Sequence, residues 1–507
     1  MTHQTGITSS ISGWAEIPLS KAVLKIPTTG KKIKQADYLA EGAFPIIDQG
    51  QEYIGGYTDD VQKLIEADSP VIVFGDHTLV AKFIDQRFAP GADGVVVLSP
   101  HKFFNAKFFW HLVQYTASNL HNKGYARHYQ NLEKSIIPVP PIREQARILA
   151  KIEKIFSEVD NGIESLKIAR EQLKVFRKAI LKHAFEGKLT AQWREENKGK
   201  LVNTAQLLAR IHGERARSFR RQIGEERTAV INADEIRVRE ENFPKTARQN
   251  VGLEIEPEEL AKLPILPDEW AYVRLSDIAE IGSGMSVSKS RSLTDPITVP
   301  YLRVANVQRG HLELSEITSM KIERDQLSRL KLKRWDVLFN EGGDRDKLGR
   351  GWIWECQIDP CITQNHVFRA SPYLPFAAHA KFISYWGNTF GQNYFVDEGK
   401  QTTNLASINK GVLSKFPIPL PSIEEQEQII FRVEEKVTLA EQLEQEVTSS
   451  LERLTALKKA ILQKAFSGKL VAQDPNDEPA SISLDRTADV RAKADNSKKK
   501  IKRRAAA

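Results

Sequence analysis

Side chains that can hydrogen-bond to base edges or neutralise phosphates gather in short polar stretches that follow apolar runs. GDHTLVAK (residues 75–82) follows the run SPVIVFG, and GGDRDKLGR (residues 342–350) follows WDVLF. Amides, imidazoles and guanidiniums read bases in a groove, and basic side chains bind phosphates. Each residue could equally be a solvated loop residue. The candidate nucleic-acid contacts are Gln49, Gln51, Tyr57, His77, Lys82, Arg127, His128, Arg303, Asn306, Arg309, Arg345, Lys347, Arg350, Thr403 and Asn404.

The sequence lacks the motifs that would place a catalytic site or a metal on this chain. The two GKL segments (residues 187–189 and 468–470) lack the earlier glycine and the Ser/Thr of a phosphate-binding GxxxxGK[ST] loop. No Asn-Pro-Pro-aromatic motif of amino-methylating enzymes occurs. Cys356, Cys361 and His366 are spaced like metal ligands, but no fourth ligand is evident. The sequence therefore predicts a binding protein with no catalytic residues, no metal and no cofactor of its own.

Composition favours a polyanionic partner and a cytoplasmic location. The 507 residues carry a formal net charge of +8, and the isoelectric point is near 9.1. Such a balance favours nucleic acid as a partner. Two cysteines provide no disulfide framework, which is typical of a reducing compartment. The mean hydropathy of −0.39 and the lack of an apolar run long enough to cross a bilayer argue against a membrane.

A stretch of about fifty residues occurs twice without a gap. It begins with PVPPIREQARI at Pro138 and with PLPSIEEQEQI at Pro419. It ends with KAILKHAFEGKLTAQ (residues 178–192) and KAILQKAFSGKLVAQ (residues 459–473), in which eleven of fifteen residues are identical. The sequences before the two copies differ, so the repeat indicates two similar modules with different binding surfaces.

Each copy contains a long heptad pattern. Apolar residues recur at alternating steps of four and three, which is the period of a coiled-coil seam. Prolines precede each pattern, and Gly187 and Gly468 follow it, so helices are predicted over residues 143–186 and 424–467. Each would be about 60 Å long. The two helices could pack on one another or on separate partners. The predicted seam and partner-binding residues include Ile152, Leu173, Phe176, Ile180, Phe185, Val433, Leu443, Leu454, Leu457, Ile461 and Phe466.

A globular block precedes each helix. Short apolar runs separated by polar turns predict α/β folds over residues 14–142 and 270–423. GWAEIPLS at Gly13 and EWAYVRLS at Glu269 suggest a distant kinship between the blocks. Residues 187–269 are predicted to be a charged linker with a basic helix at 204–222. Residues 468–507, which end in KKKIKRR before three alanines, are predicted to be a disordered basic tail.

The order of these features resembles the specificity subunit of Type I restriction–modification systems. The resemblance rests on the block, PxPxxxEQ, long helix and KAIL-x2-AF-x-GKL, followed by the same series again. GSGMSVSK (282–289), YLRVANVQRG (301–310) and QTTNLASI (401–408) also match the style of this family. The first block departs from it at GYARHYQNL (124–132), where a threonine-rich stretch is more usual.

The resemblance implies two α/β (α+β) target recognition domains joined by an antiparallel coiled coil with a pseudo-twofold internal repeat. Each domain would read one half of an asymmetric, bipartite target in double-stranded DNA. Two modification (methyltransferase) subunits and the restriction/translocase subunits would be partners, and would bind S-adenosylmethionine, ATP and Mg²⁺. Two alternatives remain open at this point: a fused Type IIG-like enzyme remnant, and a coiled-coil scaffold for protein partners only.

Overall fold

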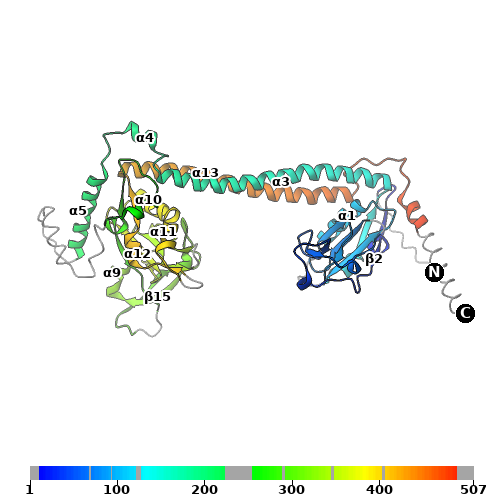
Figure 1. Cartoon of the computed structure of the whole chain (residues 1–507), viewed down its shortest axis with the longest axis horizontal. Helices are drawn as coiled ribbons and strands as arrows, with labels where there is room; N and C mark the ends of the chain where they lie inside the picture. Colours follow the sequence, from blue (N-terminus) through cyan, green and yellow to red (C-terminus); the bar gives the residue numbers. More distant parts are fainter. Residues whose placement is uncertain are drawn as a thin grey trace. The chain divides into compact units, whose positions relative to one another are not determined.

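The computed structural model describes residues 11–67, 70–92, 94–120, 127–222, 254–287, 292–343, 347–401 and 406–487. The chain divides into two compact units, residues 1–169 with 446–507 (unit 1) and residues 170–445 (unit 2). Each unit holds one head and parts of two long helices, α3 (Ile142–Phe185) and α13 (Ile423–Phe466) (Figure 1). Both helices begin and end within one residue of their predicted bounds.

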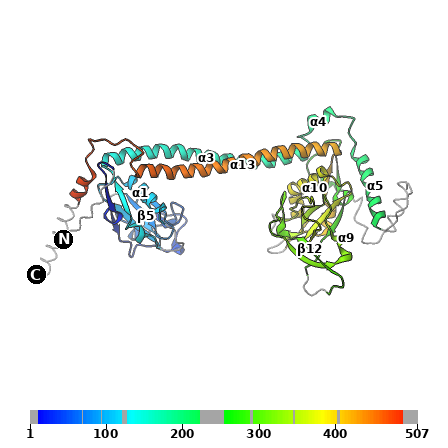
Figure 2. The same cartoon turned by 180° about the vertical axis from the view of Figure 1, so that it is seen from behind.

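The head of unit 1 is built on a four-stranded antiparallel sheet in the order β2-β8-β5-β6. Its central strand β5 is a β-branched and aromatic run, VIVFG, and is buried throughout. In a second sheet, β3 pairs antiparallel with β4 and parallel with β7. Helix α1 lies between the larger sheet and the long helices (Figure 2). The elements are β1 (Ala15–Pro18), β2 (Val23–Ile26), β3 (Phe44–Ile47), β4 (Gly56–Thr58), β5 (Val71–Gly75), β6 (Ala81–Ile84), β7 (Ala89–Pro90), β8 (Val95–Pro100), α1 (Ala106–Ser118), α2 (Tyr129–Leu132) and β9 (Ile136–Val139).

The head of unit 2 uses several small sheets in place of one larger sheet. Three three-stranded sheets have the orders β11-β19-β16, β15-β12-β18 and β17-β21-β20. Its elements are β10 (Ala271–Arg274), α8 (Leu275–Ile278), β11 (Ala279–Ser283), β12 (Pro296–Leu302), β13 (Val307–Gln308), β14 (His311–Leu312), β15 (Thr318–Glu323), α9 (Leu327–Leu330), β16 (Val337–Asn340), β17 (Gly342–Gly343), β18 (Ile362–Thr363), β19 (Val367–Pro372), α10 (Ala377–Thr389), α11 (Gly391–Glu398), β20 (Lys400–Gln401), β21 (Ala406–Ser407), α12 (Lys410–Lys415) and β22 (Pro417–Leu420).

One antiparallel strand pair closes each head. In unit 1 the first strand, β1, pairs with β9, which leads into α3. In unit 2 the first strand, β10, pairs with β22, which leads into α13. The start and the end of each head are therefore neighbouring strands. Each head contains both strands and helices, which confirms the predicted α/β folds.

The repeated Glu-Gln pair fastens each long helix to the head before it, and we call these contacts the EQ joint. In each unit the glutamate accepts the indole N–H of the tryptophan that precedes the first strand of the head. The glutamine donates to a proline carbonyl just before the helix. The contacts are Trp14–Glu144 (2.9 Å) and Gln145–Pro140 (2.9 Å) in unit 1, and Trp270–Glu425 (2.8 Å) and Gln426–Pro421 (2.9 Å) in unit 2.

The AF-x-GKL repeat supplies a second anchor in each unit. Phe466 meets Phe108 of α1 edge to face at 5.5 Å in unit 1. Phe185 meets Phe382 of α10 edge to face at 5.1 Å in unit 2. Both phenylalanines were predicted to belong to the coil and to partner binding. Their side chains are buried in the head cores, so they pack within the chain.

Within each unit the two long helices touch and run in opposite directions. In unit 1, Lys458 pairs with Asp160, and a Cβ on Gly162 would lie 3.4 Å from Leu454. In unit 2, Arg177 pairs with Glu441 at 3.3 Å. As residue numbers increase along α3, the numbers of the facing residues on α13 decrease, which is an antiparallel arrangement.

The predicted seam is only partly buried. Ile152, Ile180, Val433 and Ile461 are buried, because the heads also cover them. Leu173 and Leu454 are half-buried. The prediction was wrong for three seam positions, since one facing helix covers only a narrow stripe of its partner. These three are exposed: Phe176 (44%), Leu443 (44%) and Leu457 (43%).

The segments that follow the long helices pack on the heads. Helix α4 (Ala191–Glu196) leads to α5 (Thr204–Gln222), whose Leu207 and Ile211 are buried in the core of unit 2. The predicted disordered tail is wrong for residues 468–487, because a helix begins at Ala480 and buries that residue in unit 1. Residues 223–253 and 488–507 lie outside the described residues. A short helix, α7 (Pro257–Leu260), precedes the second head.

Among the described residues, no helix is long and apolar enough to span a membrane. The same residues hold no cluster of three histidine, cysteine, aspartate or glutamate side chains arranged to bind a metal ion. Cys356 is exposed and Cys361 is buried.

Candidate nucleic-acid interface

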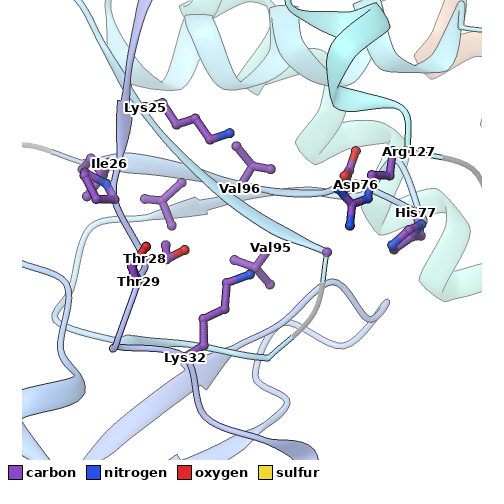
Figure 3. A pocket seen from close by; sticks show the side chains of 13 residues that line it. Lys25, Ile26, Thr28, Thr29, Lys32, Asp76, His77, Val95, Val96 and Arg127 are labelled. Atoms are coloured by element: carbon purple, nitrogen blue, oxygen red, sulfur yellow. The ribbon is translucent and has the colours of Figure 1, made fainter.

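A cleft of about 910 Å³ opens on the head of unit 1 beside β2 and β8 (Figure 3). Valines 95–97 of β8 form an apolar floor, and polar side chains rise around it. At one end lie Asp76, His77 and Arg127, and toward the other lie Lys25, Thr28, Thr29 and Lys32. Four of these side chains are basic types and one is acidic, so the cleft suits a polyanion that also presents hydrogen-bond donors.

Asp76 joins three segments at one end of the cleft. Its backbone N–H donates to the Gly94 carbonyl at 2.6 Å, and its own carbonyl accepts from His128 N–H at 2.9 Å. Its carboxylate Oδ1 accepts from Tyr129 N–H at 2.7 Å. The turn after β5, the start of β8 and the stretch before α2 are thus held together, which positions Arg127 at the rim.

The turn that carries His77 is braced by Gln49. The Gln49 carbonyl accepts from the Thr78 hydroxyl at 2.7 Å, and its side-chain oxygen lies 3.4 Å from His77 N–H. Leu79 in the same turn has a φ of 61°, which is unusual for a branched side chain. Such strained positions often occur at binding sites, where the surrounding contacts impose them.

The other candidates of the first head lie away from the cleft or face inward. Gln51 and Lys82 line a separate depression of about 540 Å³. The Lys82 ammonium is buried against the Glu52 carbonyl (2.5 Å) and Asp48 (3.4 Å). Burial lowers the pKa of Lys82, and Asp48 opposes that shift. Lys82 is therefore built into the head. His128 is buried, and Tyr57 is half-buried in β4.

Three residues of the cleft, Lys25, Lys32 and Asp76, were not predicted from the sequence. The segment KIPTTGKK (residues 25–32) is a basic turn after a short apolar run, which is a signal for phosphate binding. Asp76 gave no such signal, because a single acid in a polar turn usually caps its own turn.

In unit 2 the small sheet β17-β21-β20 brings two predicted loops together. Gly342 pairs with Ser407, and Gln401 pairs with Ala406. The stretch that begins at Gly282 joins them through residues 364–366, because Met285 bridges to Gln364 and Glu341 N–H donates to the His366 carbonyl. Three segments far apart in sequence therefore form one edge, which we call the loop edge. Arg345, Thr403 and Asn404 lie outside the described residues, and Lys347 is half-buried.

His366 stands at this loop edge and was considered in the sequence only as a metal ligand. Its Nδ1 lies 2.7 Å from Glu341 Oε2, and its Nε2 lies 3.2 Å from Asn365 Nδ2. The backbone holds the pair as well, since Glu341 N–H donates to the His366 carbonyl. The ring is exposed and oriented, as a base-reading side chain needs to be.

The loop 303–310 is held mainly by its own side chains. Asn306 is buried; its Oδ1 accepts from Arg303 N–H, and its Nδ2 donates to the carbonyls of Glu313 and Glu316, all at 2.9 Å. Asn306 therefore shapes the loop and does not face outward as predicted. Arg309 is exposed and donates to the Asn388 carbonyl. Arg350 is half-buried, and its Nη2 lies 3.4 Å from the Val304 carbonyl.

Comparisons with known proteins agree on one group. Residues 12–174 and 267–453 match a family model described as the Type I restriction modification DNA specificity domain. The chain is 24% identical to the EcoKI specificity subunit of Escherichia coli K12, covering 94% of this chain and 93% of that protein. It is 25% identical to the EcoBI specificity subunit of Escherichia coli, covering 76% and 70%.

A solved structure shares the fold. It comes from work on the complex assembly and conformational transition of the type I R-M system. The match has a TM-score of 0.54 and 16% identity, and covers 91% of this chain and 100% of the other.

Proposed function

We infer the mechanism of this chain from its family. The chain belongs to the Type I restriction modification DNA specificity family, and is the subunit that determines the DNA sequence specificity of a Type I restriction–modification system. On that premise we propose that its two heads read the two halves of an asymmetric, bipartite target. The active sites of the complex, with their S-adenosylmethionine, ATP and Mg²⁺, belong to the partner subunits.

The observation that carries this proposal is the pairing of a common joint with unlike surfaces. Both heads end on the same EQ joint and the same closing strand pair. The surfaces that face outward differ: unit 1 offers a basic cleft over a valine floor, and unit 2 offers the loop edge around His366. An unsymmetrical target requires two different binding surfaces, and the two heads carry such surfaces on a shared type of joint.

DNA is the partner that the cleft chemistry favours. Lys25 and Lys32 can neutralise phosphates, which supplies sequence-independent affinity. Asp76, His77 and Arg127 present acceptor and donor groups for base edges. We propose that the cleft of unit 1 and the loop edge of unit 2 are the two reading surfaces.

The long helices, in our proposal, form an antiparallel coiled coil that spaces the heads. The opposite helix directions within each unit support it, as do Leu454 beside Gly162 and Arg177 beside Glu441. Heads held at a fixed spacing could reach segments of DNA one or more helical turns apart. Replacing Leu454 with Asp should abolish recognition of the bipartite site, while the same change at the neighbouring exposed Arg453 should not. Unchanged target spacing in Leu454→Asp would refute the spacer role.

The helices are also the proposed docking surface for two modification subunits, which the restriction/translocase subunits join. Large apolar side chains are exposed on them, including Val175 (67%) and Phe431 (65%) in unit 2. Exposed apolar groups of this size on a polar helix mark protein interfaces when they are contiguous. Val175→Glu should reduce co-purification of the modification subunit, with Lys174→Glu as the matched control.

A head exchange tests the whole proposal. The segment from Trp270 to Ser422 would be replaced by that of a relative with a different target, leaving Glu425 and Gln426 of the EQ joint in place. The chain would be expressed with its modification subunit, and methylated adenines would be mapped across a genome. We expect one half of the target to change and the other half to stay. An unchanged target, or a change in both halves, would defeat the proposal.

A further inference from the structure

We propose that the cleft of unit 1 specifies one G·C base pair, with Arg127 on the guanine and Asp76 on the cytosine. This inference rests on the proposed function, because it assumes that the cleft faces the major groove. It adds the identity of a base pair and assigns Asp76, which the sequence did not single out, as a specificity-determining residue.

The charge pattern of the cleft motivates the assignment. Among the described residues that line the cleft, Asp76 is the single carboxylate, and the other charged groups are Lys25, Lys32 and Arg127. A carboxylate opposes phosphate binding, so a cleft that only held the DNA backbone would do better without it. Among the groups in the major groove, the cytosine N4 amine is the donor that carboxylates accept from. The acid therefore indicates a base-reading end within a phosphate-binding cleft.

Asp76 and Arg127 lie next to one another, and each keeps its own capacity to bind. Figure 3 shows their side chains together at one end of the cleft. No ion pair between them occurs among the residues that the structure describes. The hydrogen bond from Tyr129 N–H goes to Oδ1 of Asp76 and fixes the direction of the carboxylate. Arg127 is exposed at the rim, where a guanidinium can form two hydrogen bonds to guanine O6 and N7.

The pair of side chains favours G·C over the other three base pairs. With A·T in the same orientation, Arg127 would keep the adenine N7 acceptor but meet the N6 donor in place of O6, and Asp76 would meet the thymine O4 acceptor. With C·G, Arg127 would face the cytosine N4 donor and Asp76 would face the guanine acceptors, so neither hydrogen bond could form. With T·A each side chain would find one partner, but the arginine would lose its second acceptor. The expected ranking is therefore G·C first, T·A second, and A·T and C·G last.

Hydrogen bonds around the turn hold Asp76 in a fixed orientation. The three bonds of Asp76 to Gly94, His128 and Tyr129 tie the residue to neighbouring segments. The brace from Gln49 fixes the rest of the turn. Side chains held by packing and by hydrogen bonds lose little entropy on binding, so their donor and acceptor pattern is enforced.

The test uses the full chain with its modification subunit, with methylated adenines mapped genome-wide. In the half-site assigned to unit 1 by head exchange, we expect a fixed G·C pair. Asp76→Asn keeps an oxygen for Tyr129 N–H but replaces the reading oxygen with a donor. Arg127→Ala removes the guanine contact from an exposed position. Each should lower the preference for G·C over A·T at that position roughly 10- to 100-fold, with the second half-site unchanged.

Two sets of controls separate reading from charge. Lys134→Ala removes an exposed cation of unit 1 outside the cleft, and should leave the target unchanged. Lys25→Ala and Lys32→Ala should weaken binding to all sequences and lower the salt dependence by about one phosphate contact each, with the same motif.

Three results would overturn the inference. They are a unit 1 half-site without a specified G·C pair, an unchanged motif in folded Arg127→Ala, and equal loss of both half-sites in folded Asp76→Asn. The last would mean that Asp76 only holds its turn. A head exchange that changed neither half would instead defeat the proposed function, so the two failures are distinguishable.

Discussion

The two EQ joints have the same sequence motif but different electrostatic surroundings. In unit 2, Oε1 of Glu425 accepts from the Thr190 hydroxyl at 2.7 Å and from Arg194 Nε at 2.9 Å, besides the Trp270 bond to Oε2. In unit 1, Oε1 of Glu144 is buried, with no hydrogen-bond partner among the described residues.

The difference arises from the residues that follow the GKL repeat. Thr190 and Arg194 of the first copy correspond to Val471 and Pro475 of the second. Neither valine nor proline has a side-chain donor. Burial raises the pKa of Glu144, and Asp477 adds to this, while Trp14 and Arg147 oppose it. A conserved pair of residues thus does not guarantee a conserved interaction, because the donors come from a less constrained segment.

The largest expected effect is in unit 2. Glu425→Ala removes the ion-pair partner of Arg194 in a site where the arginine side chain is only 13% exposed. Removing one partner of a buried pair costs about 3–5 kcal/mol. Hydrogen exchange of α10 peptides, read against α1 peptides, would measure unit 2 by itself. Glu424→Ala, one residue earlier and exposed, is the matched control. Equal effects of the two variants would contradict the comparison.

Removing the indole donor should affect the two joints unequally. Trp14→Phe leaves Glu144 buried without its hydrogen bond, which costs about 1–3 kcal/mol. Trp270→Phe should cost less, since Glu425 keeps Thr190 and Arg194. Chemical denaturation of both variants, followed by hydrogen exchange, would rank them. If Trp270→Phe cost more stability than Trp14→Phe, the Glu144 carboxylate would be better stabilised than its hydrogen bonds indicate.

The joint of unit 1 should also respond to pH. A raised pKa in the folded state means that folded protein binds the Glu144 proton more tightly than unfolded protein does. The stability of unit 1 should therefore fall as pH rises from the ordinary glutamate value of 4.5 through the raised value. Glu144→Gln keeps an oxygen for the indole and should remove this decline. Denaturation midpoints across that range would show it, and an unchanged slope would count against it.

Supplying the missing donor should give the smallest effect. Val471→Thr introduces a hydroxyl at the position equivalent to Thr190. We expect about 0.5–1.5 kcal/mol of added stability, typical of one hydrogen bond. A double-mutant cycle with Glu144→Gln would measure the coupling. The exposed Val175→Thr serves as a control for the β-branched exchange. Zero coupling would mean that position 471 does not face the joint.

Long-range pattern was predictable from the sequence, whereas local placement was not. The heptads gave both long helices to within one residue, because 3.5-residue periodicity extends over many turns. The family followed from the repeated order of motifs, and the comparisons confirmed it. The two α/β heads followed from the short apolar runs, and the structure confirmed them. The seam was overestimated at Phe176, Leu443 and Leu457, because periodicity does not tell how wide the contact is.

The candidate site was harder to predict because loops fold by contacts far apart in sequence. Lys82 and Asn306 were predicted to lie on the surface. Both are buried, because they bind backbone carbonyls that the sequence pattern does not identify. Asp76 and Arg127 are more than forty residues apart and meet only through the three backbone and side-chain bonds of the Asp76 turn. The loop edge required the pairing of β17, β21 and β20, which are too short to be identified from sequence.

The composition of the units has a consequence for biosynthesis. Unit 2 is continuous in the chain, from residue 170 to residue 445, and can fold as soon as it leaves the ribosome. Unit 1 cannot be completed then, since Ile148 and Ile152 share a core with Ile461 and Phe466, which are translated near the end. The first-made head therefore waits with an open apolar face for the last-made helix. Truncation late in the message would damage the domain encoded at its beginning.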